Sequence, residues 1–160
     1  MDTDTAQWLR QLVDVTPNAA LATLHKGEPA VSMVPWVWAP ERGAWLIHVS
    51  ALATHTRDMQ AHPRVGLMVC DVPRPEVPPQ ALARVSFQAE ASFLDKRDAL
   101  DYAAAQALYV QRFPEAEMMF DLGDFSLVAL QPLSARLIAG FGRAYSLVGL
   151  DLTAWLSPSA

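Results

Sequence analysis

The stretch Ala44-Trp-Leu-Ile-His-Val-Ser50-Ala-Leu-Ala-Thr-His-Thr-Arg-Asp-Met59 reads as an apolar strand that runs directly into a short helix, which His62-Pro63 ends. Free backbone N–H groups and the helix dipole favour an anion at the start of a helix. Side chains that can donate hydrogen bonds gather at this junction: Ser50, Thr54, His55, Thr56 and Arg57. The pattern predicts a phosphate-binding site, whereas the simpler interpretation is a surface helix capped by Ser and Thr.

Tight turns join this strand to the segments before it. Ala19–His25 and the Val- and Trp-rich run Ala30–Trp38 flank the turn sequence Lys26-Gly-Glu-Pro29, and Pro40-Glu-Arg-Gly43 leads into Ala44–Val49. Connections this short cannot cross over a sheet, so parallel pairing is excluded. The three segments are therefore expected to form an antiparallel meander.

The rest of the chain continues the mixture of strands and helices. Apolar spacing predicts helices over Thr5–Val15, capped by Thr3 or Asp4, and over Lys96–Phe113, capped by Asp95. Further strands are expected at Val65–Val69, Arg84–Leu94, Phe125–Leu130 and Ser134–Ala139. In Arg84–Leu94 apolar and polar residues alternate strictly. A bend is expected at Gly140-Phe-Gly142, and a proline-rich surface loop over Asp71–Ala81. Without βαβ alternation, this order predicts one α+β domain over residues 1–160, mainly β: an antiparallel barrel with attached helices.

Composition excludes several classes of function. The net charge is −5 and only Lys26 and Lys96 are lysines, so the chain has no basic face for nucleic acid. The start of the chain is acidic and no apolar run is long enough to span a membrane, so a cytoplasmic protein is expected. No Cys-x-x-Cys or His-x-x-x-His pattern predicts a metal site, and Cys70, at the end of an apolar run, is expected to be buried.

Seven short motifs in a fixed order carry a resemblance to a known family. They are Ala20-Leu-Ala-Thr23, Gly27-Glu-Pro-Ala-Val-Ser32, Ser50-Ala-Leu-Ala-Thr-His-Thr56, Ala83-Arg-Val-Ser86, Arg112-Phe-Pro-Glu-Ala116, Asp124-Phe125 and Gly140-Phe-Gly-Arg-Ala144. Over nearly its whole length the chain resembles the FMN-binding split barrels of the pyridoxamine-phosphate-oxidase type, and among them the haem-utilisation (HugZ-like) branch. The resemblance implies an antiparallel split β-barrel.

The resemblance also implies a cofactor site. In such proteins the flavin phosphate lies where the third strand meets the following helix, and the ring edge meets backbone groups of the second strand. The resemblance therefore implies that Ser50, His55 and Thr56, beside Thr54 and Arg57, surround the phosphate. It also implies that Ser32, Met33 and Val34 lie along the ring and that Arg84 faces the flavin. The family is dimeric, so a homodimer with FMN between the protomers and a small-molecule substrate are expected. The aromatic residues Trp36, Trp38, Trp45 and Phe141 would fill either the core or that interface.

Two positions depart from the branch, and one segment is missing. Arg57 stands where Asn is usual and Ala89 where Gly is usual. No histidine follows His62, whereas pyridoxamine-phosphate oxidases hold the substrate with a late Arg and His, and the haem-degrading relatives supply their iron ligand from an additional C-terminal region. We therefore expect neither vitamin B6 oxidation nor haem degradation by the route of those relatives.

The individual polar residues leave few other sites. His25 and His62 are expected to be solvated, and His48 to be a partly buried, hydrogen-bonded ring; with His55 these are the available haem ligands. Ser50 and His55 do not indicate a hydrolase, because no Gly-x-Ser-x-Gly nucleophile elbow surrounds Ser50. Acidic residues after Pro114 are expected to form a solvated helix end: Glu115, Glu117, Asp121 and Asp124.

Three functions remain open at this stage. The first is an FMN-binding oxidoreductase, in which the flavin carries the redox chemistry on an unidentified small substrate. The second is a haem- or flavin-binding protein of the haem-utilisation type without oxidase turnover. The third is a relic of the fold with an empty site.

Overall fold

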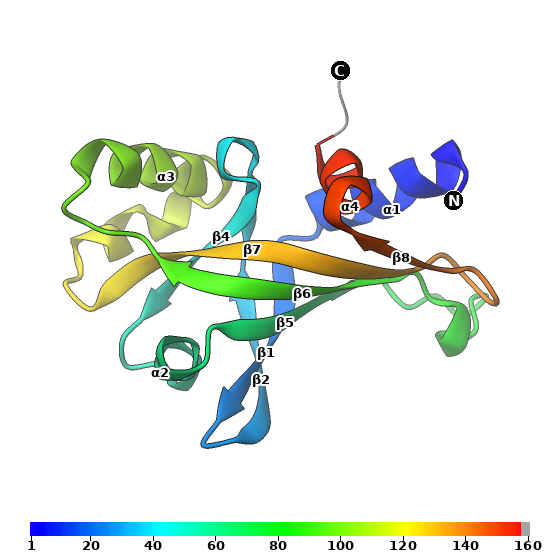
Figure 1. Cartoon of the computed structure of the whole chain (residues 1–160), viewed down its shortest axis with the longest axis horizontal. Coiled ribbons are helices and arrows are strands. Elements are labelled where there is room, and N and C mark those ends of the chain that lie inside the picture. Colours follow the sequence, from blue (N-terminus) through cyan, green and yellow to red (C-terminus); the bar gives the residue numbers. More distant parts are fainter. Residues whose placement is uncertain (158–160) are drawn as a thin grey trace.

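An antiparallel sheet of eight strands forms the centre of the protein in the computed structural model, which describes residues 1–157 (Figure 1). The strands are β1 (Asn18–His25), β2 (Glu28–Pro35), β3 (Val37–Ala39), β4 (Ala44–Ser50), β5 (Arg64–Cys70), β6 (Arg84–Phe93), β7 (Phe125–Ile138) and β8 (Ala144–Val148). The helices are α1 (Thr3–Val15), α2 (Thr54–Ala61), α3 (Ala99–Arg112) and α4 (Gly149–Leu156), with 3-10 turns η1 (Pro40–Arg42), η2 (Pro79–Ala81) and η3 (Pro114–Asp121). The predicted α+β class and antiparallel pairing are confirmed.

The two end strands of the sheet are joined directly by the chain. Its strand order is β2-β1-β5-β6-β7-β4-β3, with β8 paired to β7. The strands at the two ends of this order, β2 and β3, follow each other along the chain and are separated only by Trp36. Within residues 1–157 the seam between the end strands has no ladder of hydrogen bonds, so the barrel is split there.

The predicted three-strand meander is therefore wrong. β1 pairs with β2 and β3 pairs with β4, but β2 and β4 do not pair. The run Ala30–Trp38 breaks at Trp36, whose backbone N–H donates to Pro17 O at 3.1 Å and whose indole Nε1 donates to Thr16 O at 2.8 Å. These two bonds divert the chain from β2 into β3, so that one predicted strand becomes two.

Aromatic stacking fills the barrel interior. Trp36 stacks on Trp45 with ring centroids 4.8 Å apart, and Phe87 lies 4.4 Å from Trp45. The alternation of β6 continues this core, because Val85, Phe87, Ala89 and Ala91 are all buried. The aromatic residues expected in the core or at an interface thus divide: Trp36 and Trp45 are core, Trp38 is partly buried, and Phe141 is exposed.

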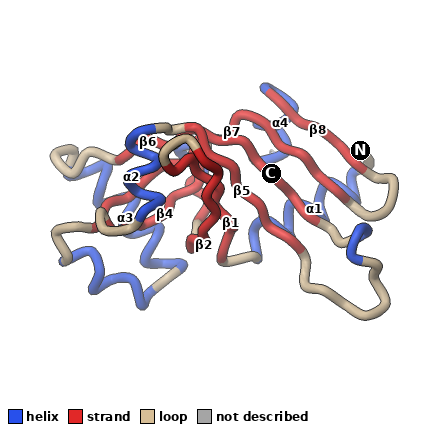
Figure 2. Tube along the Cα trace, turned by 90° about the horizontal axis from the view of Figure 1, so that it is seen from below, coloured by secondary structure: helices blue, strands red, loops and turns tan. Residues whose placement is uncertain are grey.

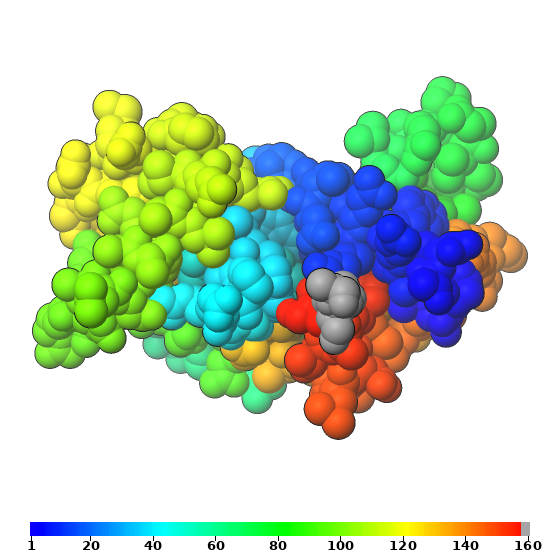
Figure 3. All heavy atoms as spheres, turned by 90° about the horizontal axis from the view of Figure 1, so that it is seen from above, coloured from blue at the N-terminus to red at the C-terminus, as the bar shows by residue number. Residues whose placement is uncertain are grey.

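A second apolar cluster lies on the opposite face of β4 and β7, beneath α3 and η3. Leu46 and Leu127 face Ala105 and Tyr109 of α3 there. Figure 2 shows α3 at one end of the sheet and α1 at the other, and Figure 3 shows the α3–η3 region and the proline-rich loop as separate projections of the surface. The two clusters leave β4 and β7 covered on both faces.

The N- and C-terminal helices pack together. Trp155 Nε1 of α4 donates to Ala6 O at 3.0 Å, and Arg10 of α1 donates to Trp155 O at 3.2 Å. The cap of α1 is Asp2, which accepts from Thr5 N at 2.9 Å, instead of the expected Thr3 or Asp4. The sequence patterns predict no element for the segment that forms β8 and α4.

Strand β7 is longer than predicted. The segments expected as two strands form one continuous strand, because Gln131-Pro132 passes through a register shift opposite Gln88 and Ala89. Proline has no N–H to donate to a ladder, and a bulge accommodates it. Cys70 is exposed, contrary to expectation, because it ends β5 on the outward side of the alternation.

Candidate functional site

The junction of β4 and α2 uses its hydroxyl groups internally. Ser50 Oγ donates to Asp124 Oδ2 at 2.5 Å and accepts from Leu52 N at 3.1 Å. Thr56, which is buried, donates from Oγ1 to Ser50 O at 2.7 Å. Two of the predicted phosphate ligands are therefore already hydrogen-bonded within the chain.

Asp124 also changes the charge of this junction. It is half-buried and holds Ser50, so it is not part of a solvated helix end, although Glu115, Glu117 and Asp121 are exposed as expected. Its carboxylate places a negative charge beside the position expected for a phosphate, which disfavours an anion there. Thr54 and Arg57 are exposed, and burial lowers the pKa of His55. The cationic character of the junction therefore rests on Arg57.

The predicted ring-binding strand, β2, has an open edge. It ends the strand order, so the side of its backbone that faces away from β1 pairs with no strand in the described chain. Ser32 Oγ is buried without a hydrogen-bond partner among residues 1–157, Val34 is buried, and Met33 is 67% exposed on the other face. An orphaned hydroxyl and free main-chain groups are suited to the polar edge of a ring-shaped ligand.

Arg84 lies far from the β4–α2 junction within one chain. It begins β6, opposite Cys70 and Ile138, whereas the junction lies near Phe93 at the other end of that strand. Arg84 and Phe93 are the two ends of the ten-residue strand β6, about 30 Å apart at about 3.3 Å per residue step. Its guanidinium donates to Leu82 O at 3.0 Å. The predicted site is thus split into two parts.

A polar cluster that the sequence does not predict lies beneath α2, and it includes His25, which is partly buried there and not solvated as expected. Asp58 is 5% exposed and accepts from Thr23 Oγ1 at 2.9 Å, while its second oxygen lies 2.8 Å from His25 Nδ1. The pKa of Asp58 is lowered, chiefly by the hydrogen bond from His25. Alternation along β1 places Thr23 and His25 on one face, but only the docking of α2 brings Asp58 to them.

His48 is more enclosed than expected. It is 8% exposed and stacks on Phe120 at a centroid distance of 3.8 Å, with Phe125 and Tyr109 around it. Neither ring nitrogen has a hydrogen-bond partner in the described part of the chain, so the expected hydrogen bond is absent there. Burial lowers the pKa of His48 to about 4, and Lys96 adds a smaller repulsion.

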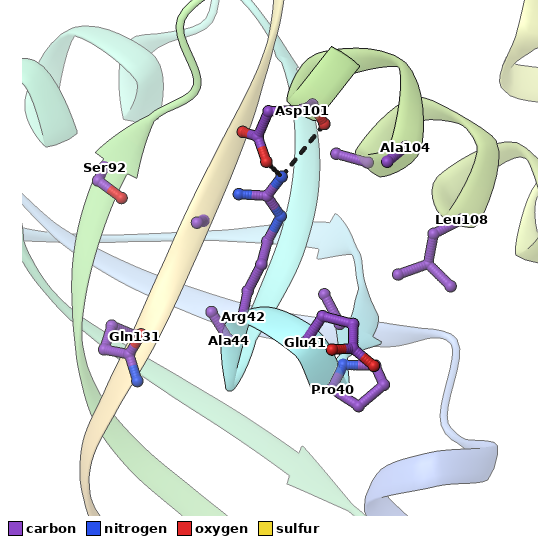
Figure 4. A pocket seen from close by; sticks show the side chains of 12 residues that line it. Pro40, Glu41, Arg42, Ala44, Ser92, Asp101, Ala104, Leu108 and Gln131 are labelled. Atoms are coloured by element: carbon purple, nitrogen blue, oxygen red, sulfur yellow. Dashed lines mark hydrogen bonds and ion pairs between the residues drawn. The ribbon is translucent and has the colours of Figure 1, made fainter. Parts of the chain in front are cut away.

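A hollow of about 680 Å³ lies apart from these residues, between α3 and the outer face of β4 and β7 (Figure 4). Alanines form much of its lining, and Arg42 spans it to pair with Asp101 on α3. None of the predicted site residues lines it. Its lining contains no histidine or cysteine, so it offers no nitrogen or sulfur ligand for a metal.

The antiparallel sheet, its split seam and the helix that follows β4 define a split barrel of the pyridoxamine-phosphate-oxidase type. The chain belongs to the pyridoxamine 5'-phosphate oxidase family, whose model matches residues 7–139. Within the family it fits the branch of HutZ and HugZ-like proteins, as its motifs had indicated.

Several of the relatives are named for haem. The chain is 33% identical over 134 residues to heme oxygenase HutZ of Vibrio cholerae, covering 82% of this chain and 74% of the relative. It is 28% identical over 121 residues to the chloroplastic non-canonical heme oxygenase HOZ of Arabidopsis thaliana, covering 76% of this chain but 35% of that protein. A heme binding protein from Mycobacterium smegmatis superposes with a TM-score of 0.80 at 30% identity, over 96% of this chain and 62% of that one.

No helix within residues 1–157 is long and apolar enough to cross a membrane.

Proposed function

We propose that this chain binds haem, as a split-barrel protein of the haem-utilisation type. The observation that carries the proposal is the similarity to HutZ at 33% identity over 82% of the chain, together with the fold shared with the M. smegmatis heme binding protein. This reverses the order of the functions favoured by the sequence, in which an FMN oxidoreductase came first. The whole activity of the longer relatives is not implied, since the chain spans 35% of the Arabidopsis protein and 62% of the M. smegmatis chain.

The β4–α2 junction disfavours the phosphate of FMN, a group that haem lacks. A flavin phosphate needs free donors and few competing negative charges, yet Ser50 and Thr56 already donate to protein acceptors and Asp124 adds a carboxylate. Haem has no phosphate, and its requirements are an apolar contact surface and an iron ligand. The arrangement therefore argues against a flavin phosphate and leaves haem unaffected.

FMN remains the second candidate because of one observation. Ser32 Oγ is buried without a partner among the described residues, on a strand with an open edge, and a flavin ring presents several polar atoms along one side. This is the binding that the family resemblance implied for Ser32, Met33 and Val34. A flavin, if bound, would supply electron transfer, while the chain would bind and orient it.

We also propose that the protein is a homodimer. The outer face of β1, β2 and β5 exposes Val31, Met33 and Met68, and the register aligns Met33, Ala20 and Met68 in one row. Arg84 belongs to this outer face on β6, so a second copy would bring its Arg84 towards the first. Covering an apolar surface of this kind is the usual driving force for association.

Titration of the purified protein with ferric haem and, separately, with FMN tests the proposal. We expect a saturable Soret band at one haem per chain and weaker binding of FMN, followed by flavin fluorescence. Tight FMN binding without a saturable Soret shift would overturn the proposal and restore the flavoprotein interpretation. Adding ascorbate to the haem-loaded protein then distinguishes storage, in which the Soret band persists, from degradation with iron release.

A further inference from the structure

The layer between α3 and the sheet is filled at one end and open at the other. At the filled end, Leu46 and Leu127 of the strands pack against Tyr109 of α3. At the open end lies the hollow of about 680 Å³ (Figure 4). Ligand sites in proteins usually have volumes of about 300 to 1,000 Å³, so the hollow has room for a small organic molecule.

The register of the strands explains why this end is open. The strand positions that face α3 here carry only short side chains: Ala39, Ala44, Ser92 and Ala129. Ala44 lies opposite Ala39 and Ser92 lies opposite Ala129, so these short side chains adjoin one another. On α3 the facing residues are alanines as well, Ala104 and Ala105. Side chains this short do not reach across the layer between a helix and a sheet, so apolar walls enclose space for further atoms.

Three charged groups border the hollow, and one of them is unpaired. Arg42 extends across it, pairs with the carboxylate of Asp101 and donates to Asp101 O at 3.2 Å. Glu41 is exposed and forms no ion pair within residues 1–157. Two carboxylates against one guanidinium leave an excess of negative charge at the hollow, which favours a cationic ligand.

The hydrogen-bonding capacity of the rim agrees with its charge. Gln131 donates from Nε2 to Gly43 O at 2.9 Å, which leaves its Oε1 as an acceptor. Asp101 receives Arg42 on Oδ1, so its Oδ2 is the second acceptor, and the carboxylate of Glu41 is the third. The guanidinium of Arg42 is directed at Asp101 (Figure 4). An ammonium group, with three N–H donors and no acceptor, is the matching partner for such a rim.

We propose that the hollow beneath α3 is a second ligand site, for a small molecule that carries an ammonium group on an apolar, ring-sized body. The alanine walls contact the body, and Glu41 attracts the ammonium group at the rim. The site is separate from the β4–α2 junction and from β2, since none of the residues predicted to bind the cofactor lines the hollow. It therefore does not depend on the proposed haem binding.

Calorimetric titration of the purified protein with three probes tests the class of ligand. Naphthylethylamine, naphthylethanol and naphthylacetate share one apolar body and are a cation, a neutral molecule and an anion at neutral pH. We expect the amine to bind at least about fivefold more tightly than the acetate, with the alcohol between them. Equal affinities for the three probes, or no saturable binding of the amine, would overturn the proposal.

A pair of alanine variants on α3 tests the location. Ala104→Trp places an indole ring at the hollow from an exposed position, and should weaken the binding of naphthylethylamine at least about tenfold. Ala103→Trp is the matched control, since Ala103 is exposed on the same helix and does not line the hollow.

Nuclear magnetic resonance of labelled alanine methyl groups gives the location without a substitution. Naphthylethylamine should shift the methyl signals of Ala104 and Ala129, and leave that of Ala103 in place. If the amine binds but neither of those two signals moves, the hollow is not its site.

A pair of glutamate variants tests the charge. Glu41→Gln keeps an acceptor oxygen but removes the negative charge, so it should weaken naphthylethylamine by about threefold and reduce its preference over naphthylacetate. Glu76→Gln removes an exposed carboxylate from the proline-rich loop, away from the hollow, and should change neither value. A preference that Glu41→Gln leaves intact would show that Glu41 does not select the ammonium group.

Discussion

At the scale of single residues, His48 shows how the apolar layer beneath α3 controls a titration. Its ring is stacked on Phe120 and lacks hydrogen-bond partners in the described chain, so a proton on it would be poorly solvated. The folded state therefore favours the neutral form of the His48 ring. Lys96 is the cation that acts on it, as the second cause of its lowered pKa.

This predicts a loss of stability in mild acid. The pKa of His48 falls from 6.5 to about 4 on folding, so the unfolded chain binds the proton first as the pH drops. The unfolding free energy should decrease between pH 6.5 and 4, by up to about 3 kcal/mol at about 1.4 kcal/mol per pKa unit. Urea unfolding curves at pH 7 and pH 4.5 measure it.

His48→Leu is the control for this dependence. It removes the titrating group and fills the same apolar space, so the difference between the two pH values should shrink by most of that amount. An equal acid dependence in the variant would show that other groups cause it.

Ser50 gives a second prediction at this scale. Its hydroxyl donates to the carboxylate of Asp124, and hydrogen bonds to charged groups contribute about 1.5 to 3 kcal/mol. Ser50→Ala should lower the unfolding free energy by about 1 to 3 kcal/mol in urea. Thr54→Ala, an exposed position at the same junction, should stay within about 0.5 kcal/mol. A neutral Ser50→Ala would mean that the bond to Asp124 carries no net stability.

At the scale of elements, α3 begins at Ala99 because Asp98 caps it. Apolar spacing predicts a start at Lys96 with Asp95 as cap, but Asp95 pairs with Arg97, and Asp98 accepts from Asp101 N at 3.2 Å. Three aspartates within seven residues offered three possible caps, and the choice depends on where the helix meets β4 and β7. Apolar periodicity locates a helix, but seldom its first residue.

The cap of α3 is open to a direct measurement. Asp98→Ala should cost about 1 kcal/mol of unfolding free energy, because a first-turn N–H loses its acceptor. Asp98→Ser retains a capping oxygen and should recover most of the loss. If Asp95→Ala proved more harmful than Asp98→Ala, the helix would have to start at the earlier cap in solution.

Local patterns predict part of the fold and of the site, and contacts that form only in the folded chain decide the rest. The alternation of β6 and the turn chemistry of β1 and β2 are local signals, and both were read correctly. The division at Trp36 depends on acceptors at Thr16 and Pro17, which only the folded state brings near. The Asp58–His25 contact likewise joins residues 33 apart in sequence, without a local pattern to reveal it.

At the scale of the whole molecule, association is the main expectation. The row of Met33, Ala20 and Met68 is an apolar strip on an otherwise solvent-facing sheet. Met33→Glu should shift the proposed dimer to monomer, because a carboxylate buried at an interface without a partner is strongly unfavourable. Sedimentation at micromolar concentration measures the shift.

Leu100→Glu is the matched control, since Leu100 is 88% exposed on α3, away from this face. It should leave the mass unchanged. A wild-type protein that sediments as a monomer at every concentration tested would contradict the dimer itself.

The chain connection through Trp36, which links the end strands β2 and β3, affects the speed of folding. Barrel closure usually requires distant strands to find each other, with a loop entropy to overcome. Here the two ends of the strand order are neighbours along the chain. The slow step is therefore the pairing of β4 with β7, two strands distant in sequence, in which Ser50 lies opposite Phe125. The N- and C-terminal helices touch, so a circular permutant could join them and open the chain at Trp36. Such a permutant would retain the sheet but refold more slowly, because closure would then become a long-range event.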